Sequence, residues 1–269
     1  MNLKTKIPKT TVFVDGGKIM DNDFNSEYKG FAYIYDALTD DVEYEKRASY
    51  AEMLFEKYMD GMPKLVCDLA CGTGTICSIL DGRGYDMIGI DGSEDMLCVA
   101  SQKTLGKNVL YINSDITDFE LYGTVDAMLC MLDSINYLTD DGDLDKLFAL
   151  VKNYLNKGGL FVFDINTPYK YSKILADNVY TYEKDNIFYI WENDFDGEYC
   201  DFYLNFFVKQ NDGKYKRISE VHTQKMYTID CISDKILSAG LTLLAVFDDL
   251  SLKMPENNSQ RVIFVVKNC

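Results

Sequence analysis

The sequence predicts an α/β protein with a mainly parallel sheet and a smaller antiparallel sheet inserted toward its C-terminal end. Between Pro63 and Pro168, short apolar runs alternate with segments of helical period, as in a parallel sheet covered by helices on both faces. Between residues 180 and 228, polar and apolar residues alternate instead, and Asp-Gly pairs interrupt the pattern. That alternation is typical of an antiparallel meander joined by tight turns.

The elements can be placed in chain order from this patterning. Residues 28–38 predict a short aromatic helix and residues 43–59 a longer amphipathic one. Strands of the parallel sheet are expected at 64–70, 86–91, 108–115, 125–132 and 160–166, with helices at 73–84, 93–105 and 143–159. After the meander, a helix at 231–240 and strands at 241–250 and 261–268 complete the predicted fold.

Three parts are expected from these elements. Residues 1–25 form a flexible tail or a small hairpin around Asp15-Gly16. Residues 26–168 and 229–269 form the α/β core, and residues 169–228 form the antiparallel insertion. The insertion follows the fifth strand directly, so we expect it to overhang one end of the large sheet.

Composition limits the kinds of partner. The net charge of −16 argues against a nucleic acid or an anionic membrane surface, because both require clustered Lys and Arg. The eight cysteines include no C-x-x-C pair, and most of them lie in or beside apolar segments, so no metal site is predicted. No signal segment and no run of eighteen apolar residues is recognisable, which favours a cytoplasmic protein with reduced thiols.

The stretch VCDLACGTGTICSIL, residues 66–80, reads as a buried strand, a glycine turn and the start of a helix. Such a turn offers unpaired N–H groups to a ligand. Gly72 and Gly74 match a dinucleotide fingerprint, but its third glycine is replaced by Cys77. Carboxylates also end successive strands, at Asp68, Asp91 and after the third strand at Asp115. These would repel a phosphate but suit ribose hydroxyls, an amine and a positive centre.

With these residues the chain resembles the class I S-adenosylmethionine-dependent methyltransferases. VCDLACGTG resembles the first motif of that family, IGIDGSEDML the second and INSDITDF the third. VDAMLCMLDSINYL and GGLFVFDIN resemble the segments of its fourth and fifth strands. The resemblance implies a Rossmann-like, seven-stranded, mostly parallel sheet whose last strand is antiparallel. One departure is Ala70, where many members have glycine.

The resemblance also implies S-adenosyl-L-methionine as the cofactor and assigns roles to individual residues. Asp91 is expected to accept both ribose hydroxyls, Asp115 the adenine amine, and the Ile116 amide to meet the adenine ring. Met96 either packs on adenine or joins its helix to the sheet. The full set expected at the cofactor is Asp68, Ala70, Cys71, Gly72, Gly74, Asp91, Gly92, Met96, Asp115, Ile116, Met131, Tyr28 and Tyr33.

Transfer of a methyl group from a sulfonium depends mainly on proximity and orientation, and a base is needed only when the acceptor must lose a proton. Similar inserted sheets occur in small-molecule N- and O-methyltransferases, so a small acceptor is expected. The residues expected to contact it are Ser134, Asn136, Tyr137, Trp191, Tyr203 and Glu220. His222, the only histidine, is the candidate base, and Tyr35 is the second candidate for a catalytic role.

Two other functions remain open at this point. One is an NAD(P)-dependent or nucleotide-sugar oxidoreductase, which would need a catalytic Tyr-x-x-x-Lys that the sequence does not supply. The other is a non-catalytic protein that binds S-adenosylmethionine. The protein is expected to be a monomer or a homodimer, and the aromatic face of residues 169–228 suits either a substrate lid or a dimer interface.

Overall fold

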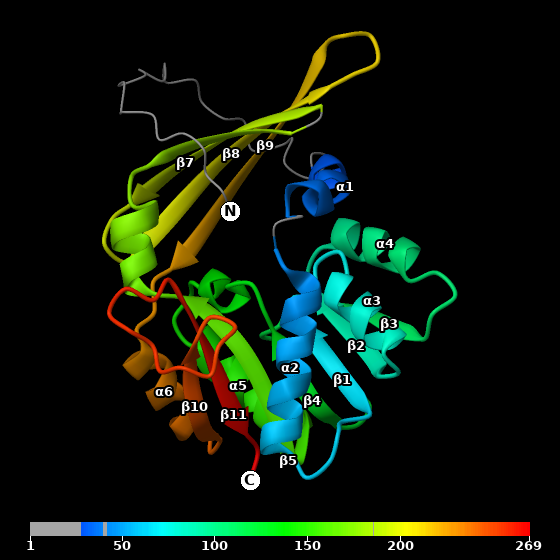
Figure 1. The fold of residues 1–269 in the computed structure, drawn as a ribbon, viewed down its shortest axis with the longest axis vertical. Coiled ribbons are helices and arrows are strands. Elements are labelled where there is room, and N and C mark those ends of the chain that lie inside the picture. Colours follow the sequence, from blue (N-terminus) through cyan, green and yellow to red (C-terminus); the bar gives the residue numbers. More distant parts are fainter. Residues whose placement is uncertain (1–27, 40–41, 185) are drawn as a thin grey trace.

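The computed structural model describes residues 28–39, 42–184 and 186–269, and these residues form two separate sheets (Figure 1). The predicted tail, residues 1–25, lies outside the described residues. The larger sheet has seven strands and the smaller has four. In Figure 1 the smaller sheet stands above one end of the larger one, and helix α1 lies between the smaller sheet and helix α4.

The seven-stranded sheet confirms the predicted fold class. Its order is β10-β11-β5-β4-β1-β2-β3, and β11 is antiparallel to both of its neighbours while the other pairs are parallel. The strands are β1 (Leu65–Leu69), β2 (Asp86–Asp91), β3 (Val109–Asn113), β4 (Val125–Cys130), β5 (Leu155–Asn166), β10 (Thr242–Asp248) and β11 (Arg261–Lys267). The chain order reverses between β1 and β4, so their carboxyl ends border a crevice of the kind that holds ligands in open α/β sheets.

Six α-helices lie within the described residues, close to the predicted places. They are α1 (Tyr28–Leu38), α2 (Tyr44–Tyr58), α3 (Thr75–Gly82), α4 (Glu94–Lys103), α5 (Asp143–Tyr154) and α6 (Ile229–Ser238). Two short helical segments, η2 (Ser134–Tyr137) and η3 (Lys170–Leu175), were not predicted. The helix expected over 143–159 was placed too long: it ends at Tyr154, and Leu155 already pairs with β4.

The cause of that early end is the glycine pair that follows. Gly158 has φ +81°, outside the helical region, and a Cβ on Gly159 would lie 2.7 Å from the Asp126 carbonyl oxygen. Only glycine allows the backbone to approach β4 so closely. The two glycines therefore belong to the entrance of β5.

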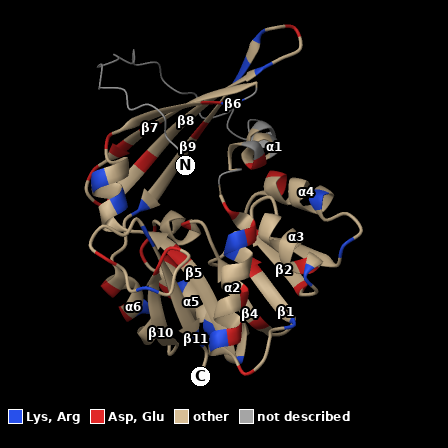
Figure 2. Ribbon diagram, viewed as in Figure 1, with Lys and Arg blue, Asp and Glu red and all other residues tan. Residues whose placement is uncertain are grey.

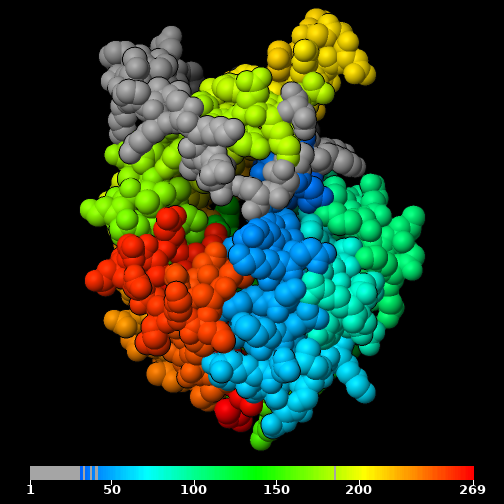
Figure 3. All heavy atoms as spheres, in the orientation of Figure 1, coloured from blue at the N-terminus to red at the C-terminus, as the bar shows by residue number. Residues whose placement is uncertain are grey.

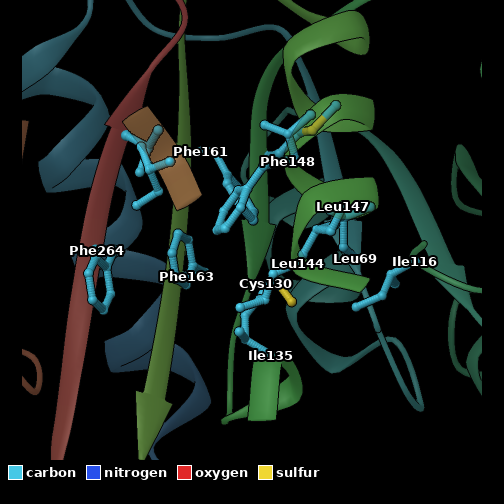
Figure 4. Packing of buried hydrophobic residues seen from close by; sticks show 14 of the residues in the cluster. Leu69, Ile116, Cys130, Ile135, Leu144, Leu147, Phe148, Phe161, Phe163 and Phe264 are labelled. Carbon is cyan, nitrogen blue, oxygen red and sulfur yellow. The ribbon is translucent and has the colours of Figure 1, made fainter. Parts of the chain in front are cut away.

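Apolar side chains fill both faces of the seven-stranded sheet. On one face α5 and α6 pack against a cluster that includes five phenylalanines, and the Phe163 and Phe264 rings stack with centroids 4.9 Å apart (Figure 4). On the other face α2 and α3 cover a second cluster around Leu54 and Leu80. Burial on both faces explains why the strands read as continuous apolar runs, and the strands of this sheet are mostly uncharged (Figure 2).

The insertion forms the four-stranded antiparallel sheet, whose strands pair in chain order. The strands are β6 (Val179–Lys184), β7 (Ile187–Phe195), β8 (Tyr199–Lys209) and β9 (Tyr215–Lys225). The predicted Asp-Gly turns join them: the Asp196 carboxylate accepts from the N–H groups of Glu198 and Tyr199, at 2.8 and 2.7 Å. One face of this sheet packs on α1, where the Phe31 and Phe206 rings lie 5.3 Å apart.

Within the part of the chain that the structure describes, no helix is both long and apolar enough to span a membrane.

Candidate functional site

A cavity of about 870 Å³ lies between the carboxyl ends of the large sheet and the inner face of the insertion. Its lining includes Asp68, Asp91 and Asp115 from the strand ends and Trp191 and His222 from the insertion. In Figure 3 the insertion lies above α2 and above the segment that follows β10, two parts that border the cavity through Arg47 and Asp249. Residues from both sheets of the fold therefore line the cavity.

In the turn between β1 and α3, three alternate residues have positive φ. Ala70, Gly72 and Gly74 have φ of +56°, +54° and +68°, so Ala70 occupies a conformation that favours glycine. The Gly72 N–H donates to the Asp91 carboxylate at 2.8 Å, which fixes the turn against β2. Gly74 faces away from the cavity: a Cβ there would lie 2.9 Å from the Ala100 Cβ and would collide with the Tyr111 hydroxyl. Its smallness therefore serves packing.

The three predicted carboxylates all line the cavity. Asp68 is 3% exposed and accepts from the Cys77 thiol, and burial raises its pKa to about 7. Burial also raises the pKa of Asp91, whose two oxygens accept from the Gly72 and Ser93 amides. Asp115 accepts from both the amide and the hydroxyl of Thr117, each at 2.7 Å. Together these groups make one half of the cavity a region of negative potential, suited to a cationic ligand.

Most other residues predicted for the cofactor surround these carboxylates. The cavity is also lined by Ala70, Cys71, Gly72, Gly92, Met96, Ile116 and Met131. The side chains of Tyr28 and Tyr33 lie outside the described residues. Tyr35 lines the cavity, and burial raises its pKa well above its ordinary value.

The insertion supplies the opposite wall. Trp191 of β7, Phe202, Leu204 and Phe206 of β8, and His222 of β9 line the cavity. His222 lies between the rings of Phe31 and Tyr137, with centroids 6.0 and 5.9 Å away, and its Nε2 is 3.8 Å from a Glu220 carboxylate oxygen. Burial lowers the pKa of His222, so the imidazole is neutral at neutral pH.

Two of the six residues predicted to face an acceptor are placed elsewhere. Tyr203 is 38% exposed and projects from the outer face of the small sheet, because its neighbours Phe202 and Leu204 take the inner face. Asn136 is fully buried: its amide donates to the Lys225 carbonyl and accepts from the Asn166 N–H, each at 2.9 Å. It ties η2 to both sheets instead of facing the cavity.

The other four predicted acceptor residues are near the cavity. Ser134, Tyr137 and Trp191 line it. Glu220 is buried beside His222, two residues before it on β9 and on the same face of the small sheet, but it does not line the cavity.

Comparisons with known proteins agree with this geometry. The family described as methyltransferase domain matches residues 66–159, from β1 to the entrance of β5. A putative methyltransferase of Geobacillus sp. strain WCH70 is 31% identical over 249 residues, which are 89% of this chain and 99% of that protein. A crystal structure of an S-adenosylmethionine-dependent methyltransferase from Clostridium acetobutylicum is 34% identical, with TM-score 0.81 over 89% of this chain and 98% of the other.

The chain belongs to the class I S-adenosylmethionine-dependent methyltransferases. It is therefore an enzyme with S-adenosylmethionine as its cofactor. A structure of the sugar N-methyltransferase KedS8 from Streptoalloteichus sp. shares the fold as well, with TM-score 0.73 and 18% identity over 97% of this chain and 98% of that one.

The site of this methyltransferase fits its cofactor by charge. S-adenosylmethionine carries a sulfonium and an amino group, and the cavity offers carboxylates at Asp68, Asp91 and Asp115 with no Lys or Arg beside them in its lining from β1 to β3. Ile116 and Met96 add apolar surface next to these acceptors. The residues present thus match the mixed polar and apolar character of a nucleoside.

A charged cluster that was not predicted lies at the far side of the cavity of this methyltransferase. Asp164, at the end of β5, accepts from the amides of Leu132 and Asp133, at 2.8 and 2.7 Å, and pairs with Arg261. Arg47 of α2 pairs with both oxygens of Asp249, at 3.1 and 3.2 Å.

Two residues of the insertion, Gln224 and Lys170, lie at this cluster. Arg261 pairs with Asp133, and Asp133 also accepts from the Gln224 side chain of β9 at 2.6 Å. Lys170 of η3 lines the cavity beside the cluster. These residues form no sequence motif, and Arg47 and Asp249 alone are 202 positions apart, so only the fold brings them together.

Proposed function

We propose that this methyltransferase transfers its methyl group to a nitrogen or oxygen atom of a small molecule held beneath the insertion. The observation that carries the proposal is a single cavity with carboxylates at one end and an aromatic wall at the other. A volume of about 870 Å³ lies in the range of small-ligand pockets. The likeness to a sugar N-methyltransferase fold supports the same acceptor class.

In this proposal the carboxyl ends of β1, β2 and β3 bind the cofactor. Asp91 accepts the ribose hydroxyls with the lone pairs that Gly72 and Ser93 leave free, and Asp115 and the Ile116 amide recognise adenine. Asp68 attracts the positive end of the molecule. S-adenosylmethionine supplies a methyl group on a sulfonium, and these residues fix where that methyl group lies.

The insertion, residues 169–228, serves as the lid that selects the acceptor. Trp191, Phe202 and Phe206 exclude water and give an apolar surface to the acceptor. His222 takes the proton that the acceptor loses, because its lowered pKa keeps the imidazole neutral and it faces the cavity. Tyr35 keeps its proton, because burial raises its pKa, and so acts as a hydrogen-bond donor.

We further propose that the protein works in the cytoplasm, where thiols stay reduced. All eight of its cysteines are free, and Cys67, Cys77 and Cys130 are packed in the core as small apolar side chains. Activity as a monomer or as a homodimer is compatible with the cavity, since every residue assigned a role above comes from one chain. That a metal, a nucleic acid and a membrane are all dispensable stays a prediction.

The proposal is tested with radioactive methyl-labelled cofactor and an extract separated by size. We expect label in molecules below about 1 kDa, the size that such a cavity holds. The Asp91→Ala variant should leave the same fraction unlabelled. Label found only in protein or RNA would refute the small-molecule acceptor, and label that persists with Asp91→Ala would refute the role of Asp91.

A further inference from the structure

The cations that line the cavity all lie on its acceptor side. They are Arg47, Lys170 and Arg261, whereas the lining contributed by β1 to β3 holds carboxylates. Arg47 and Arg261 are ion-paired with carboxylates of the cluster described above. Lys170 differs, because within the described residues no carboxylate oxygen lies within 4.0 Å of its Nζ.

The Lys170 ammonium has donors to spare. Its Nζ donates to the Asn166 side-chain oxygen at 2.8 Å, and an ammonium group carries three N–H donors. Burial lowers the pKa of Lys170 to about 8, which still leaves most of the molecules charged at pH 7. Lys170 is half-buried in the cavity wall, so the remaining N–H donors of its ammonium point into the cavity space, where water or an anionic ligand can accept them.

Arg47 is a second cation in this part of the cavity wall. Its side chain is 9% exposed and lines the cavity, its two terminal nitrogens face Asp249, and its Nε–H has no acceptor among the described residues. That nitrogen has almost no accessible surface, so Arg47 adds positive charge to the cavity wall but offers no donor within reach of a ligand. The negative charges of Asp164 and Asp249 act to raise the pKa of Lys170, and the same two carboxylates lie 3.9 and 3.1 Å from a terminal nitrogen of Arg47. The two cations therefore lie around the same carboxylates.

The carboxylates near Lys170 all have other partners. Asp133, Asp164 and Asp249 are each already engaged, by Arg261 and Gln224, by two backbone amides and Arg261, and by Arg47, respectively. With three cations and three carboxylates the cluster is neutral as a whole. The donors that it presents to the cavity are therefore those of the Lys170 ammonium that Asn166 leaves unused.

We propose that the acceptor of this methyltransferase carries an oxyanion, a carboxylate or a phosphate, and that the Lys170 ammonium binds it. The inference rests on the proposed small-molecule function and names the class of acceptor. The acceptor is then a molecule with a nucleophilic nitrogen or oxygen at one end and an anionic group at the other. The anionic group binds at Lys170 while the aromatic wall contacts the part between.

The direct test uses inorganic phosphate and acetate as separate probes, titrated by calorimetry into protein saturated with S-adenosylhomocysteine at constant ionic strength. We expect one saturable site for at least one probe, with a Kd of about 1–10 mM, a value usual for a fragment. The probe that binds more tightly tells phosphate from carboxylate.

Two methionine variants on the same short helix give a matched pair. Lys170→Met should weaken binding of the probe at least tenfold, whereas Lys173→Met, at an exposed position outside the cavity, should leave it unchanged. Equal binding by wild type and Lys170→Met, or no saturable binding of either probe, would overturn the proposal.

A second measurement covers the case in which Lys170→Met does not fold. The Lys170→Arg variant keeps the charge that the cluster needs, and we expect it to bind the probe within about fivefold of wild type, as a point-charge contact allows. In wild type, the ¹³C resonance of reductively methylated Lys170, assigned by its loss in Lys170→Arg, should shift with the probe. A Lys170 resonance that shifts with neither probe would also refute the proposal.

Failure here is separable from failure of the proposed function. Label in small molecules together with no anion binding would remove only the oxyanion subsite. Anion binding at Lys170 together with label confined to macromolecules would remove the small-molecule function and keep the subsite.

Discussion

The two halves of the cavity are built in opposite ways. The cofactor half comes from the ends of three adjacent parallel strands, and its carboxylates fall within residues 68–115. The acceptor half draws on α1, α2, η3, the insertion and β11, which lie far apart in the chain. The first half depends on local strand–turn–helix geometry, and the second on long-range packing.

Because of this difference, binding of the cofactor and selection of the acceptor depend on different parts of the structure. Contacts of the cofactor half are fixed by the sheet itself, for instance by the bond from the Gly72 amide to Asp91. Contacts of the acceptor half depend on how the small sheet sits over the large one, through Gln224 and Asn136. Substitutions in one half should therefore leave the other half's binding nearly unchanged.

The largest expected effect is on the cofactor half. Asp91→Ala removes charge-assisted hydrogen bonds to the ribose, each worth about 1.5–3 kcal/mol, so affinity for S-adenosylhomocysteine should fall about 100-fold. Isothermal titration calorimetry measures this affinity. Asp95→Ala, on the adjoining helix and outside the cavity, is the control and should bind like wild type. An Asp91→Ala protein that binds within threefold of wild type would show that Asp91 only fixes the turn.

Next in size is a change confined to the acceptor half. Trp191→Ala opens the aromatic wall, and kcat/KM for the acceptor should fall about 30-fold, the loss of roughly 2 kcal/mol of contact. The Kd for S-adenosylhomocysteine should stay within twofold. Steady-state kinetics and calorimetry on the same preparation separate the two quantities.

The matched control for Trp191→Ala lies on the same sheet. Tyr203→Ala removes an aromatic ring from the outer face, so it should leave turnover intact. Sedimentation velocity on both variants tests whether the small sheet is a dimer interface instead of a lid. A shift toward monomer with Trp191→Ala, at unchanged kcat/KM, would favour the interface.

A third effect should be visible in the pH dependence of cofactor binding. Burial raises the pKa of Asp68 to about 7, so below that pH the carboxyl is protonated and cannot attract a cation. Affinity for S-adenosylmethionine should therefore rise with pH, by about tenfold between pH 6 and 8. Asp68→Asn should reduce this slope, leaving the smaller contribution of Asp91, whose pKa is also raised. A slope that is identical in Asp68→Asn would assign the titration to another group.

The smallest effect concerns His222, the only histidine of the chain. Because burial lowers its pKa, NMR titration of the imidazole should give a pKa below the ordinary value of 6.5, and protein unfolded in urea should return to about 6.5. The unfolded chain then binds more protons than the native one as the pH falls below 6.5, so the free energy of unfolding decreases there. A native pKa at or above 6.5 would contradict the burial and weaken the case for a neutral base.

The sequence alone places the carboxylates of the cofactor half at one end of the sheet, because their positions depend on local strand–turn–helix geometry. Asp68 and Asp91 end strands, and parallel strands place such ends together whatever the rest of the fold does. In the insertion, Trp191 and His222 line the cavity as expected, while their roles stay predictions, and Tyr203 lies on the opposite face. Trp191 pairs with Leu204, and His222 with Phe202, so Tyr203 necessarily faces the other side.

The wrong prediction for Tyr203 has a simple physical origin. Side chains alternate along a strand with period two, so a one-residue error in the assumed pairing places every residue on the wrong face. The pairing is fixed by turn geometry that the alternation alone does not reveal. The charged cluster was beyond reach for a different reason: Arg47 and Asp249 lie 202 positions apart and meet only in the folded chain.

The insertion leaves the core after β5 and returns before α6, and none of its described strands pairs with a strand of the large sheet. Evolution can consequently alter β6 to β9 without disturbing a single ladder of the parallel sheet. Among descendants of a common ancestor, residues 179–225 should therefore diverge faster than residues 65–130. For protein engineering, the same separation makes the small sheet an exchangeable cassette, in which a new acceptor range is sought by replacing one continuous segment.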